Sequence, residues 1–428
     1  MKTAPTNHSE FQRDIYGAFA PPLQPTCPNA LEQHAHKVLK EPAWHYINGS
    51  AALGLTAKAN REAFDRYPLV PRMLRDVTTR STRVTLFGKT YDSPILAAPV
   101  GVQQIAHADG EIASARGAAA QNVPFICSTA STRTLEEVAD ACGTNEHWYQ
   151  LYWPKSDEVC ISLLERAQKA GYTTLVVTLD TFVLGWRSRD LDTAYLPFLY
   201  GLGTQIGLTD PVFNAKFEQE PAPGFADLKL LLSKARGPLH LAKLLYYAKT
   251  IRKARAWLGE MNSETFKSWE QLKLIRAHWP SKILLKGVQH VEDAALAIEY
   301  GMDGLCVSNH GGRQVSGAIA SLDALNNICQ DKRVQEAVKQ GFTLLFDSGI
   351  RTGSDILKAL AIGAHGVLVG RPYIYGLSLN GQAGVEHVFQ CLKADLEISM
   401  VSAGVKELTR EELDKVVGWS KPQQAAHL

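Results

Sequence analysis

The sequence predicts a single (β/α)8 barrel, the TIM-barrel architecture of the α/β class. Eight short apolar runs, most of them rich in β-branched residues, follow one another after residue 90, and stretches of helical period separate most of them. The runs end in polar or glycine residues, and the C-terminal strand ends of this fold line the active site. Packing of the core does not require polar residues at the same end of every strand. The polar strand ends therefore also indicate an active site, and so an enzyme.

The expected strands are short. They cover residues 95–99, 125–129, 147–152, 174–180, 282–287, 304–309, 343–349 and 366–371. Helical periodicity is clearest over residues 109–121, 157–171, 291–301 and 353–363. We expect an N-terminal helical cap segment at residues 1–90, the barrel at residues 91–400 and a C-terminal tail at residues 401–428.

One connection is much longer than the others. It follows the fourth strand and separates Asp180 from Lys282. The excess, residues 191–268, contains Pro- and Gly-rich patches and then a basic helical stretch at residues 225–258. A loop this long inside a compact domain is usually functional. We therefore expect an active-site lid and a surface helix with a solvated basic face; membrane contact is the less favoured interpretation of that face.

Composition limits the possible functions. Of the 428 residues, 45% are hydrophobic and 21% are charged, which describes an ordinary globular protein with an ample core. The net charge of +2 gives no argument for a nucleic-acid partner. The seven cysteines are scattered and form no Cys-x-x-Cys pair, which favours free thiols over a disulfide framework or a zinc site. We expect no metal.

The two ends of the chain bear on where the protein is located. Residues 1–20 lack the apolar stretch of a signal peptide, and no run approaches the 18 apolar residues of a membrane span. We therefore expect a cytoplasmic protein without a membrane span. The C-terminal Ala426-His427-Leu428 has the small-basic-leucine form of a peroxisomal address, so a peroxisomal location is the alternative.

The most informative motif is Ser308-Asn309-His310-Gly311-Gly312-Arg313-Gln314, which follows an expected strand. Its glycines allow the backbone to approach a ligand closely, its histidine titrates near neutral pH, and its arginine offers a planar fork to a carboxylate. A base and an anion clamp three residues apart indicate chemistry on a small organic acid. A polar loop that merely closes a strand is the less favoured interpretation.

Together with two later motifs, this run resembles a known family, the FMN-dependent 2-hydroxy acid oxidases and dehydrogenases. The later motifs are Asp347-Ser-Gly-Ile-Arg351-Thr-Gly and Gly363-Ala-His-Gly-Val-Leu-Val-Gly370-Arg371-Pro372. The resemblance extends over residues 46–377. Within the family, residues 71–76, 150–153, 184–187 and 194–198 are most similar to the lactate 2-monooxygenase branch.

The resemblance agrees with the residue chemistry on how a substrate would be handled. His310 would be the catalytic base, and Asp180 would orient it and stabilise its imidazolium. Arg187 and Arg313 would hold the substrate carboxylate through charge-assisted hydrogen bonds. Two tyrosines would complete the site, with Tyr46 on the carboxylate and Tyr152 on the substrate oxygen.

The resemblance also implies FMN as the cofactor. A buried Lys286 requires nearby negative charge, and the resemblance places it at the N1–C2 edge of the flavin ring. The backbone of Pro99, Val100 and Gly101 would lie against N5. The side chains that would bond the ring are those of Ser128, Gln150 and Thr178.

The remaining cofactor residues follow the last two strands, where this fold commonly binds phosphate. Asp347 would bind the ribityl hydroxyls. The expected phosphate residues are Gly349, Arg351, Gly370 and Arg371. An ion pair between Asp347 and Arg351 is the structural alternative.

Gly101 bears on the fate of oxygen. The lactate monooxygenase branch carries glycine at this position, whereas many oxidases of the family carry alanine. More room near N5 would let the keto acid remain while oxygen reacts, which favours lactate 2-monooxygenase, with acetate, carbon dioxide and water as products. The close alternative is an (S)-2-hydroxy acid oxidase that releases keto acid and hydrogen peroxide.

A barrel that only binds ligands is disfavoured, because every expected catalytic position is filled. The family implies a homotetramer or octamer.

Overall fold

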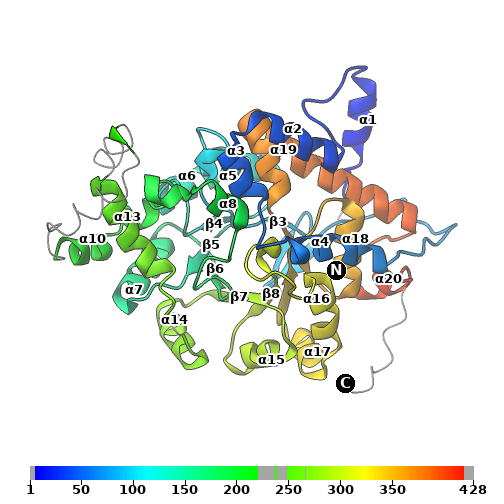
Figure 1. The fold of residues 1–428 in the computed structure, drawn as a ribbon. Helices are drawn as coiled ribbons and strands as arrows, with labels where there is room; N and C mark the ends of the chain where they lie inside the picture. The colour runs from blue at the N-terminus through cyan, green and yellow to red at the C-terminus, as the bar shows by residue number, and fades with distance from the viewer. Residues whose placement is uncertain (1–4, 220–236, 239–247, 266, 419–428) are drawn as a thin grey trace.

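The computed structural model describes residues 5–219, 237–238, 248–265 and 267–418. Eight parallel strands form a closed barrel in the order β10-β3-β4-β5-β6-β7-β8-β9 (Figure 1). Their bounds are β3 Ile95–Ala97, β4 Phe125–Ser128, β5 His147–Tyr152, β6 Thr174–Thr178, β7 Lys282–Val288, β8 Gly304–Val307, β9 Thr343–Phe346 and β10 Gly366–Val369. The predicted barrel is confirmed. Most strands end a few residues early, because the polar residues that follow leave the ladder and form the loops of the site.

The barrel lumen is filled by one large or medium side chain from each strand. These residues are Leu96, Ile126, Trp148, Val176, Leu284, Cys306, Leu345 and Leu368. These side chains are buried and pack against one another, so the lumen is a packed core and not a channel.

A hairpin that the sequence analysis did not predict covers one end of this core. It consists of β1 Val84–Leu86 and β2 Lys89–Tyr91, and its two-residue turn has positive φ at both Phe87 and Gly88. The Phe87 ring packs edge-on against Trp148, near the start of β5, with centroids 5.8 Å apart. The hairpin therefore closes the N-terminal end of the barrel and leaves the C-terminal end for the site.

Helices surround the barrel. The four predicted helices are present as α5 Glu111–Ala120, α7 Asp157–Lys169, α15 Val291–Glu299 and α18 Gly353–Ile362. The further helices between and after the barrel strands are α6 Leu135–Cys142, α14 Leu272–His278, α16 Ser321–Gln330, α17 Lys332–Lys339, α19 Arg371–Ala403 and α20 Arg410–Asp414. The long α19 changes direction where Gly381 has a positive φ of 56°, and its buried residues pack it along α5 and α18.

The first helices of the chain are α1 Glu10–Gly17, α2 Pro28–Val38, α3 Glu41–Asn48 and α4 Leu55–Glu62, followed by a short turn, η1 Ala63–Arg66. The described part of the C-terminal segment packs back onto the chain: Val405 and Val416 are buried, and a bridge joins Leu69 to Val417. The Ala426-His427-Leu428 signal lies outside the described residues.

The described part of the long connection after β6 consists of helices. These are α8 Ser188–Asp192, η3 Pro197–Tyr200, α9 Gln205–Leu208, α10 Pro211–Glu218 and the longer α13 Ala248–Met261. The predicted helix at residues 225–258 is thus confirmed at α13, while residues 225–236 and 239–247 lie outside the described part. One side of α13 is buried, since Trp257 is fully covered and packs edge-on against Phe213 at 5.1 Å.

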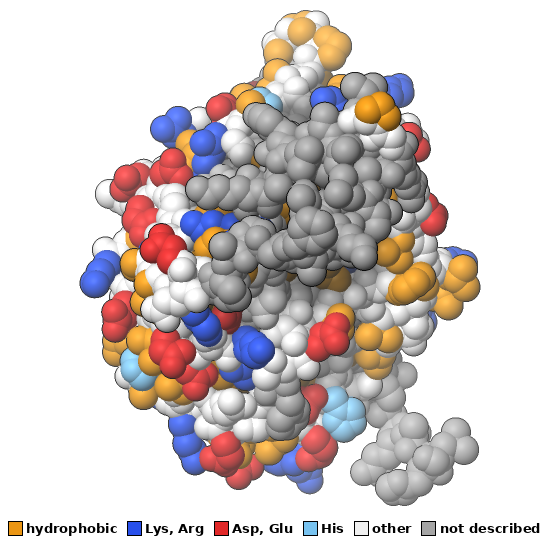
Figure 2. Space-filling view, turned by 60° about the vertical axis from the view of Figure 1, so that its left-hand side comes forward, with side chains coloured by type: hydrophobic (Ala, Val, Ile, Leu, Met, Phe, Trp, Pro, Cys, Tyr) orange, Lys and Arg blue, Asp and Glu red, His pale blue; other side chains and the backbone are white. Residues whose placement is uncertain are grey.

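On the face drawn in Figure 2, acidic and basic side chains alternate over the described surface. Within the described ranges, none of the helices combines the length and the apolar content that a membrane crossing requires. All seven cysteines are described, and each is a free thiol.

Candidate active site

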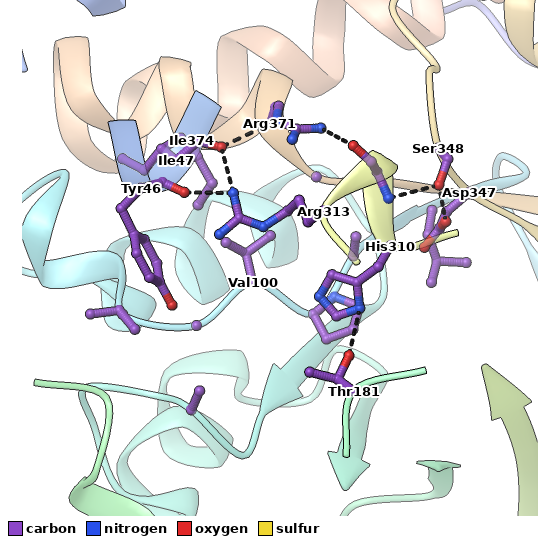
Figure 3. Close-up of a pocket in the computed structure, with 18 of the residues that line it drawn as sticks. Tyr46, Ile47, Val100, Thr181, His310, Arg313, Asp347, Ser348, Arg371 and Ile374 are labelled. Atoms are coloured by element: carbon purple, nitrogen blue, oxygen red, sulfur yellow. Dashed lines mark hydrogen bonds between the residues drawn. The ribbon is translucent and has the colours of Figure 1, made fainter. Parts of the chain in front are cut away.

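A cavity opens at the C-terminal ends of the barrel strands (Figure 3). Its walls come from the loops after the strands, from α3, and from the insertion, which contributes Phe198, Met261 and Asn262. All but four of the site residues expected from sequence line this cavity. The exceptions are Asp180, Ser128, Gln150 and Thr178, which lie behind its wall.

The centre of the site is a histidine–carboxylate pair. His310 Nδ1 lies 2.9 Å from Asp180 Oδ1, although 130 residues separate the two in sequence. Thr181 donates to the same carboxylate oxygen at 2.6 Å and lies 3.2 Å from His310 Nδ1. No hydrogen bond within the described chain engages His310 Nε2, so this nitrogen remains available to a ligand in the cavity.

The electrostatics of this pair favour a charged carboxylate beside a neutral imidazole. Burial raises the pKa of Asp180, but His310 and Lys286 more than offset this effect, and the pKa lies below its ordinary value. Burial is the largest influence on His310 and lowers its pKa; Lys286 and Arg187 act in the same direction, and Asp180 opposes them. The net pKa of His310 lies below the ordinary histidine value of 6.5. A neutral imidazole at physiological pH is the form that accepts a proton.

The histidine loop is held in a strained conformation. His310 has a positive φ of 58° and Ser348 one of 83°, values that non-glycine residues rarely adopt. Hydrogen bonds hold both residues: His310 N donates to Ser308 Oγ at 3.0 Å, and Gly311 N donates to Ser348 Oγ at 2.9 Å. The surrounding contacts thus determine the orientation of the His310 ring (Figure 3).

Two arginines cap the C-terminal end of α3. Arg313 Nη1 donates to the carbonyls of Tyr46 at 2.6 Å and Gly49 at 3.0 Å, and Arg371 Nη2 donates to Gly49 at 2.8 Å. The last carbonyls of a helix lack partners within it, and this end of the helix dipole attracts cations. The Arg313 guanidinium also lies over the Tyr46 ring, 5.2 Å from its centroid. Helix α3 therefore positions Tyr46 and Arg313 together in the cavity wall.

Arg187 comes from the loop after β6 and is buried. Its Nη2 donates to Gln314 Oε1 at 3.1 Å, and its Nε approaches the Arg313 carbonyl at 3.4 Å. Burial lowers the pKa of Arg313 to about 9, with Arg187 and Arg371 adding repulsion. Cations this close together and buried form a site that an anion would stabilise.

Lys286 lies near the C-terminal end of β7, lines the cavity and is 4% exposed. Its Nζ lies 3.1 Å from Asp347 Oδ2 and donates to Ser308 Oγ at 3.0 Å. Burial lowers the pKa of Lys286, but Asp347 and Asp180 more than offset this, so the ammonium group stays charged. The expected alternative, an ion pair between Asp347 and Arg351, is wrong, because the Asp347 carboxylate pairs with Lys286 instead.

Three predicted ring-binding residues form a chain across neighbouring strands. Ser128 Oγ donates to Gln150 Oε1 at 3.0 Å, and Gln150 Nε2 donates to Thr178 Oγ1 at 3.0 Å. All three are buried. These hydrogen bonds fix the three side chains relative to one another on adjacent strands β4, β5 and β6.

Gly101 lines the cavity, but a side chain at this position would point at the loop after β4. A Cβ at this position would lie 2.6 Å from Ala130 Cβ and 2.8 Å from the Ala130 carbonyl oxygen. The expectation that glycine leaves room here therefore needs correction: the loop after β4 approaches so closely that it fills the room. An alanine at residue 101 would have to displace that loop before it could crowd a ligand.

The loops after β9 and β10 form the far end of the cavity, with Gly349, Arg351, Gly370 and Arg371. Gly349 has a φ of +104°, and a Cβ there would meet the Asn60 carbonyl at 2.8 Å. Arg371 uses three donors on the carbonyls of Ile47, Gly311 and Gly49. Arg351 donates only to its neighbouring Ile350 carbonyl among described residues, which leaves most of its fork free.

Two residues that hold the site together, Gln314 and Ser308, were not predicted from the sequence. Gln314 donates to the Asp180 carbonyl at 2.8 Å and accepts from Arg187, which ties the two catalytic loops to each other. Ser308 accepts from both Lys286 and His310. Both residues stand inside the quoted 308–314 motif, so proximity to the histidine was the one available signal.

The comparisons with known proteins agree with this geometry. Residues 35–416 match the FMN-dependent dehydrogenase family. The chain belongs to this family. The enzyme is 43% identical over 406 residues to the FMN-dependent alpha-hydroxy acid dehydrogenase qulF of Penicillium citrinum, with 94% of each chain covered. It is 38% identical over 384 residues to the L-lactate oxidase of Lysinibacillus sphaericus (strain C3-41), with 90% of each chain covered.

A crystal structure of mandelate oxidase superposes with a TM-score of 0.72 at 31% identity and covers 92% of this chain and 98% of that chain. The enzyme is therefore an FMN-dependent 2-hydroxy acid oxidoreductase, and its cofactor is FMN. The cavity fits this group. It has a buried ammonium group at Lys286 for the electron-rich edge of a ring, and a glycine cradle with a free Arg351 fork for a phosphate.

Proposed function

We propose that the enzyme oxidises L-lactate with molecular oxygen as a lactate 2-monooxygenase, forming acetate, carbon dioxide and water. The observation that carries the oxidation step is the His310–Asp180 pair, which lies at the same cavity as the buried Arg187 and the half-buried Arg313. A base and two cations in this arrangement suit a short acid that carries a hydroxyl group next to its carboxylate.

In this proposal the arginines bind the substrate first. Arg187 and Arg313 hold the carboxylate, and the Tyr46 hydroxyl adds a hydrogen bond to it. The buried Tyr152, whose pKa burial raises to about 12, remains protonated and donates to the substrate oxygen. This orientation brings the α-carbon and its hydroxyl toward His310.

His310 Nε2 then accepts a proton from the substrate. Asp180 holds the opposite ring nitrogen, which selects the tautomer with a free Nε2 and stabilises the imidazolium that forms. FMN would supply the acceptor for the electron pair that leaves the α-carbon. Lys286 would hold one edge of the flavin ring. The Pro99–Gly101 backbone would lie against the face of the ring, and the chain of Ser128, Gln150 and Thr178 would bond its polar edge. Asp347 would bind the ribityl group. The phosphate would meet Gly349, Arg351, Gly370 and Arg371.

The proposed overall reaction is balanced in two stages. Lactate and oxygen give pyruvate and hydrogen peroxide, and peroxide then cleaves the pyruvate C1–C2 bond to give acetate, carbon dioxide and water. The second stage requires pyruvate to remain in the cavity. Phe198, Met261 and Asn262 of the insertion support retention, because they line the cavity and add to its wall.

A second candidate is an (S)-2-hydroxy acid oxidase that releases the keto acid and peroxide. The similarity to an L-lactate oxidase favours it, and so does the close approach of Ala130 to Gly101, which removes one argument for extra space. The two candidates share the cofactor and every residue named above.

A product assay decides between them. The holoenzyme is incubated with L-lactate under air, and acetate, pyruvate and peroxide are measured per oxygen consumed. We expect mainly acetate with little free peroxide. Stoichiometric peroxide and pyruvate would contradict the monooxygenase and leave the oxidase, while no oxygen uptake with reduction of an artificial acceptor would indicate a dehydrogenase.

We also propose that the enzyme assembles as a homotetramer or octamer and acts in the cytoplasm, with the peroxisome as the alternative location. Light scattering of the purified holoenzyme would test the assembly, and a fluorescent fusion that leaves the C-terminal Ala-His-Leu free would test the location.

A further inference from the structure

Asp190 is an acidic side chain close to the two arginines that the proposed function assigns to the substrate carboxylate. It lies in α8, three residues after Arg187, and its backbone N–H donates to the Arg187 carbonyl at 3.0 Å. Its Oδ1 lies next to Gly49, at 3.9 Å from a Cβ built there. The Gly49 carbonyl is the acceptor that Arg313 and Arg371 share. The carboxylate therefore lies beside the arginine cluster.

The Asp190 carboxylate is not used in an ion pair. Its Oδ1 is shielded from solvent and has no hydrogen-bond partner in the described chain. No salt bridge joins it to any described cation, and the nearby guanidinium groups of Arg313 and Arg371 donate to backbone carbonyls instead. A shielded carboxylate oxygen without a hydrogen-bond partner is costly unless the charge serves another purpose.

The charges of Asp190 and the arginines nevertheless influence one another. Burial raises the pKa of Asp190, and Arg313, Arg187 and His45 partly offset that rise. Burial, Arg187 and Arg371 lower the pKa of Arg313, while Tyr46 and Asp190 oppose them. Asp190 thus supplies negative charge to a cluster of buried cations without occupying their donors.

We propose that Asp190 is a positioning residue that weakens carboxylate binding at Arg187 and Arg313 and so speeds the release of the 2-keto acid. The inference rests on the proposed function of those two arginines. Two carboxylates that approach the same cations repel each other, and the repulsion is strong where water is excluded. Without Asp190 the arginines would bind substrate and product tightly, which would slow turnover.

The test is Asp190→Asn in the FMN-loaded enzyme, titrated with propanoate, which has the carbon skeleton of lactate but no hydroxyl to oxidise. The change in flavin absorbance reports binding. We expect the Kd for propanoate to fall on the order of tenfold, because one opposing charge is removed from a poorly solvated site. The KM for L-lactate should fall with it, and kcat should fall where product release limits turnover.

Two controls separate charge from damage. Asp192→Asn, an exposed neighbour on the same helix, should leave the propanoate Kd unchanged. Propanamide, the neutral analogue, should bind the Asp190→Asn and unmodified enzymes alike. A general disturbance of the site would instead weaken the binding of both probes.

The outcomes are distinct. An unchanged or higher propanoate Kd in Asp190→Asn, with normal binding to the unmodified enzyme, overturns the role of Asp190 and leaves the proposed function intact. Failure of the unmodified enzyme to bind propanoate at all overturns the arginine clamp of the proposed function, and this inference with it.

Discussion

The surroundings of His310, the proposed base, fix its backbone and one of its ring nitrogens. Its backbone lies in the left-handed region, its Nδ1 meets Asp180 at 2.9 Å, and Ser308 holds its N–H. These constraints leave only Nε2 facing the cavity. Because burial outweighs Asp180 and lowers the pKa of His310, the ring is neutral before the substrate arrives.

Replacing His310, the proposed base, should separate cofactor binding from flavin reduction. His310→Gln should still bind FMN and appear yellow, because the Arg351 end of the cavity is untouched. Flavin reduction by L-lactate, measured anaerobically in a stopped-flow instrument, should slow by about 10²–10⁴-fold, the usual contribution of one general base. Reduction at the unmodified rate would show that another group takes the proton.

The pH dependence of flavin reduction should report the same pair. The unmodified enzyme needs neutral His310, so its rate at low substrate should fall only below pH 6.5, the ordinary histidine value. Asp180 raises the pKa of His310, so Asp180→Asn should lower that pKa further and move the acid limb to still lower pH. The maximal rate should also drop, because the imidazolium loses its stabilising charge. An acid limb that moves to higher pH would contradict this assignment.

At the scale of elements, the insertion completes an apolar wall that the barrel alone lacks. Phe198 of η3 packs edge-on against Tyr46 at 6.4 Å and belongs to a small buried cluster with Val102 and Ala130. Helix α13 supports this wall, because its contacts with η3 are extensive and Met261 at its end lines the cavity. The side of the site that would receive the substrate side chain is therefore apolar.

Truncating this wall should change specificity and oxygen chemistry together. Phe198→Ala should raise kcat/KM for 2-hydroxyhexanoate relative to L-lactate, since it opens space beside Tyr46. It should also increase peroxide release from lactate, because the product is retained less well. A buried Phe→Ala change costs about 3–5 kcal/mol of stability, so Tm is measured in parallel.

Phe217→Ala provides the matched control for that variant. Phe217 lies in the same insertion, on α10, and stacks on Phe213 away from the cavity. It should lose stability without a change in the substrate ratio. Equal shifts in both variants would mean that the insertion acts only through folding.

At the scale of the whole molecule, the barrel has two different ends. The β1–β2 hairpin and the lumen side chains close the N-terminal end, so they contribute stability and no chemistry. All the loops that line the cavity gather at the C-terminal end. The buried Lys286 at this end would hold the edge of the flavin ring, so cofactor binding should add to the stability of the folded chain.

Cofactor removal should therefore destabilise the protein as a whole. We expect heat or acid denaturation to release noncovalent FMN in a ratio near one per chain, identified by chromatography of the supernatant. Adding FMN back to the apoprotein should raise Tm with a dependence on FMN concentration, as for any ligand that binds only the folded state. Recovery of FAD, or flavin that stays with the precipitated chain, would contradict this prediction.

The fold could be predicted in detail because each barrel strand is a continuous apolar run that ends in polar residues. This pattern is local and depends only on burial of both faces of a parallel strand. The hairpin at residues 84–91 escaped prediction, since its strands are too short to show a period. The packing of residues 404–418 escaped as well, because it depends on residues 68–82 from the far end of the chain.

The sequence by itself determined which chemical groups are present, their order along the chain and the family to which they belong, because motifs such as 308–314 are contiguous. Only the tertiary structure decided how those groups meet. The 2.9 Å contact of His310 with Asp180, the pairing of Asp347 with Lys286, the closeness of Ala130 to Gly101 and the shielded Asp190 beside the arginines all join separate loops. Such distances follow from barrel closure and from charge balance in a site that excludes water, and neither is a local property of the chain.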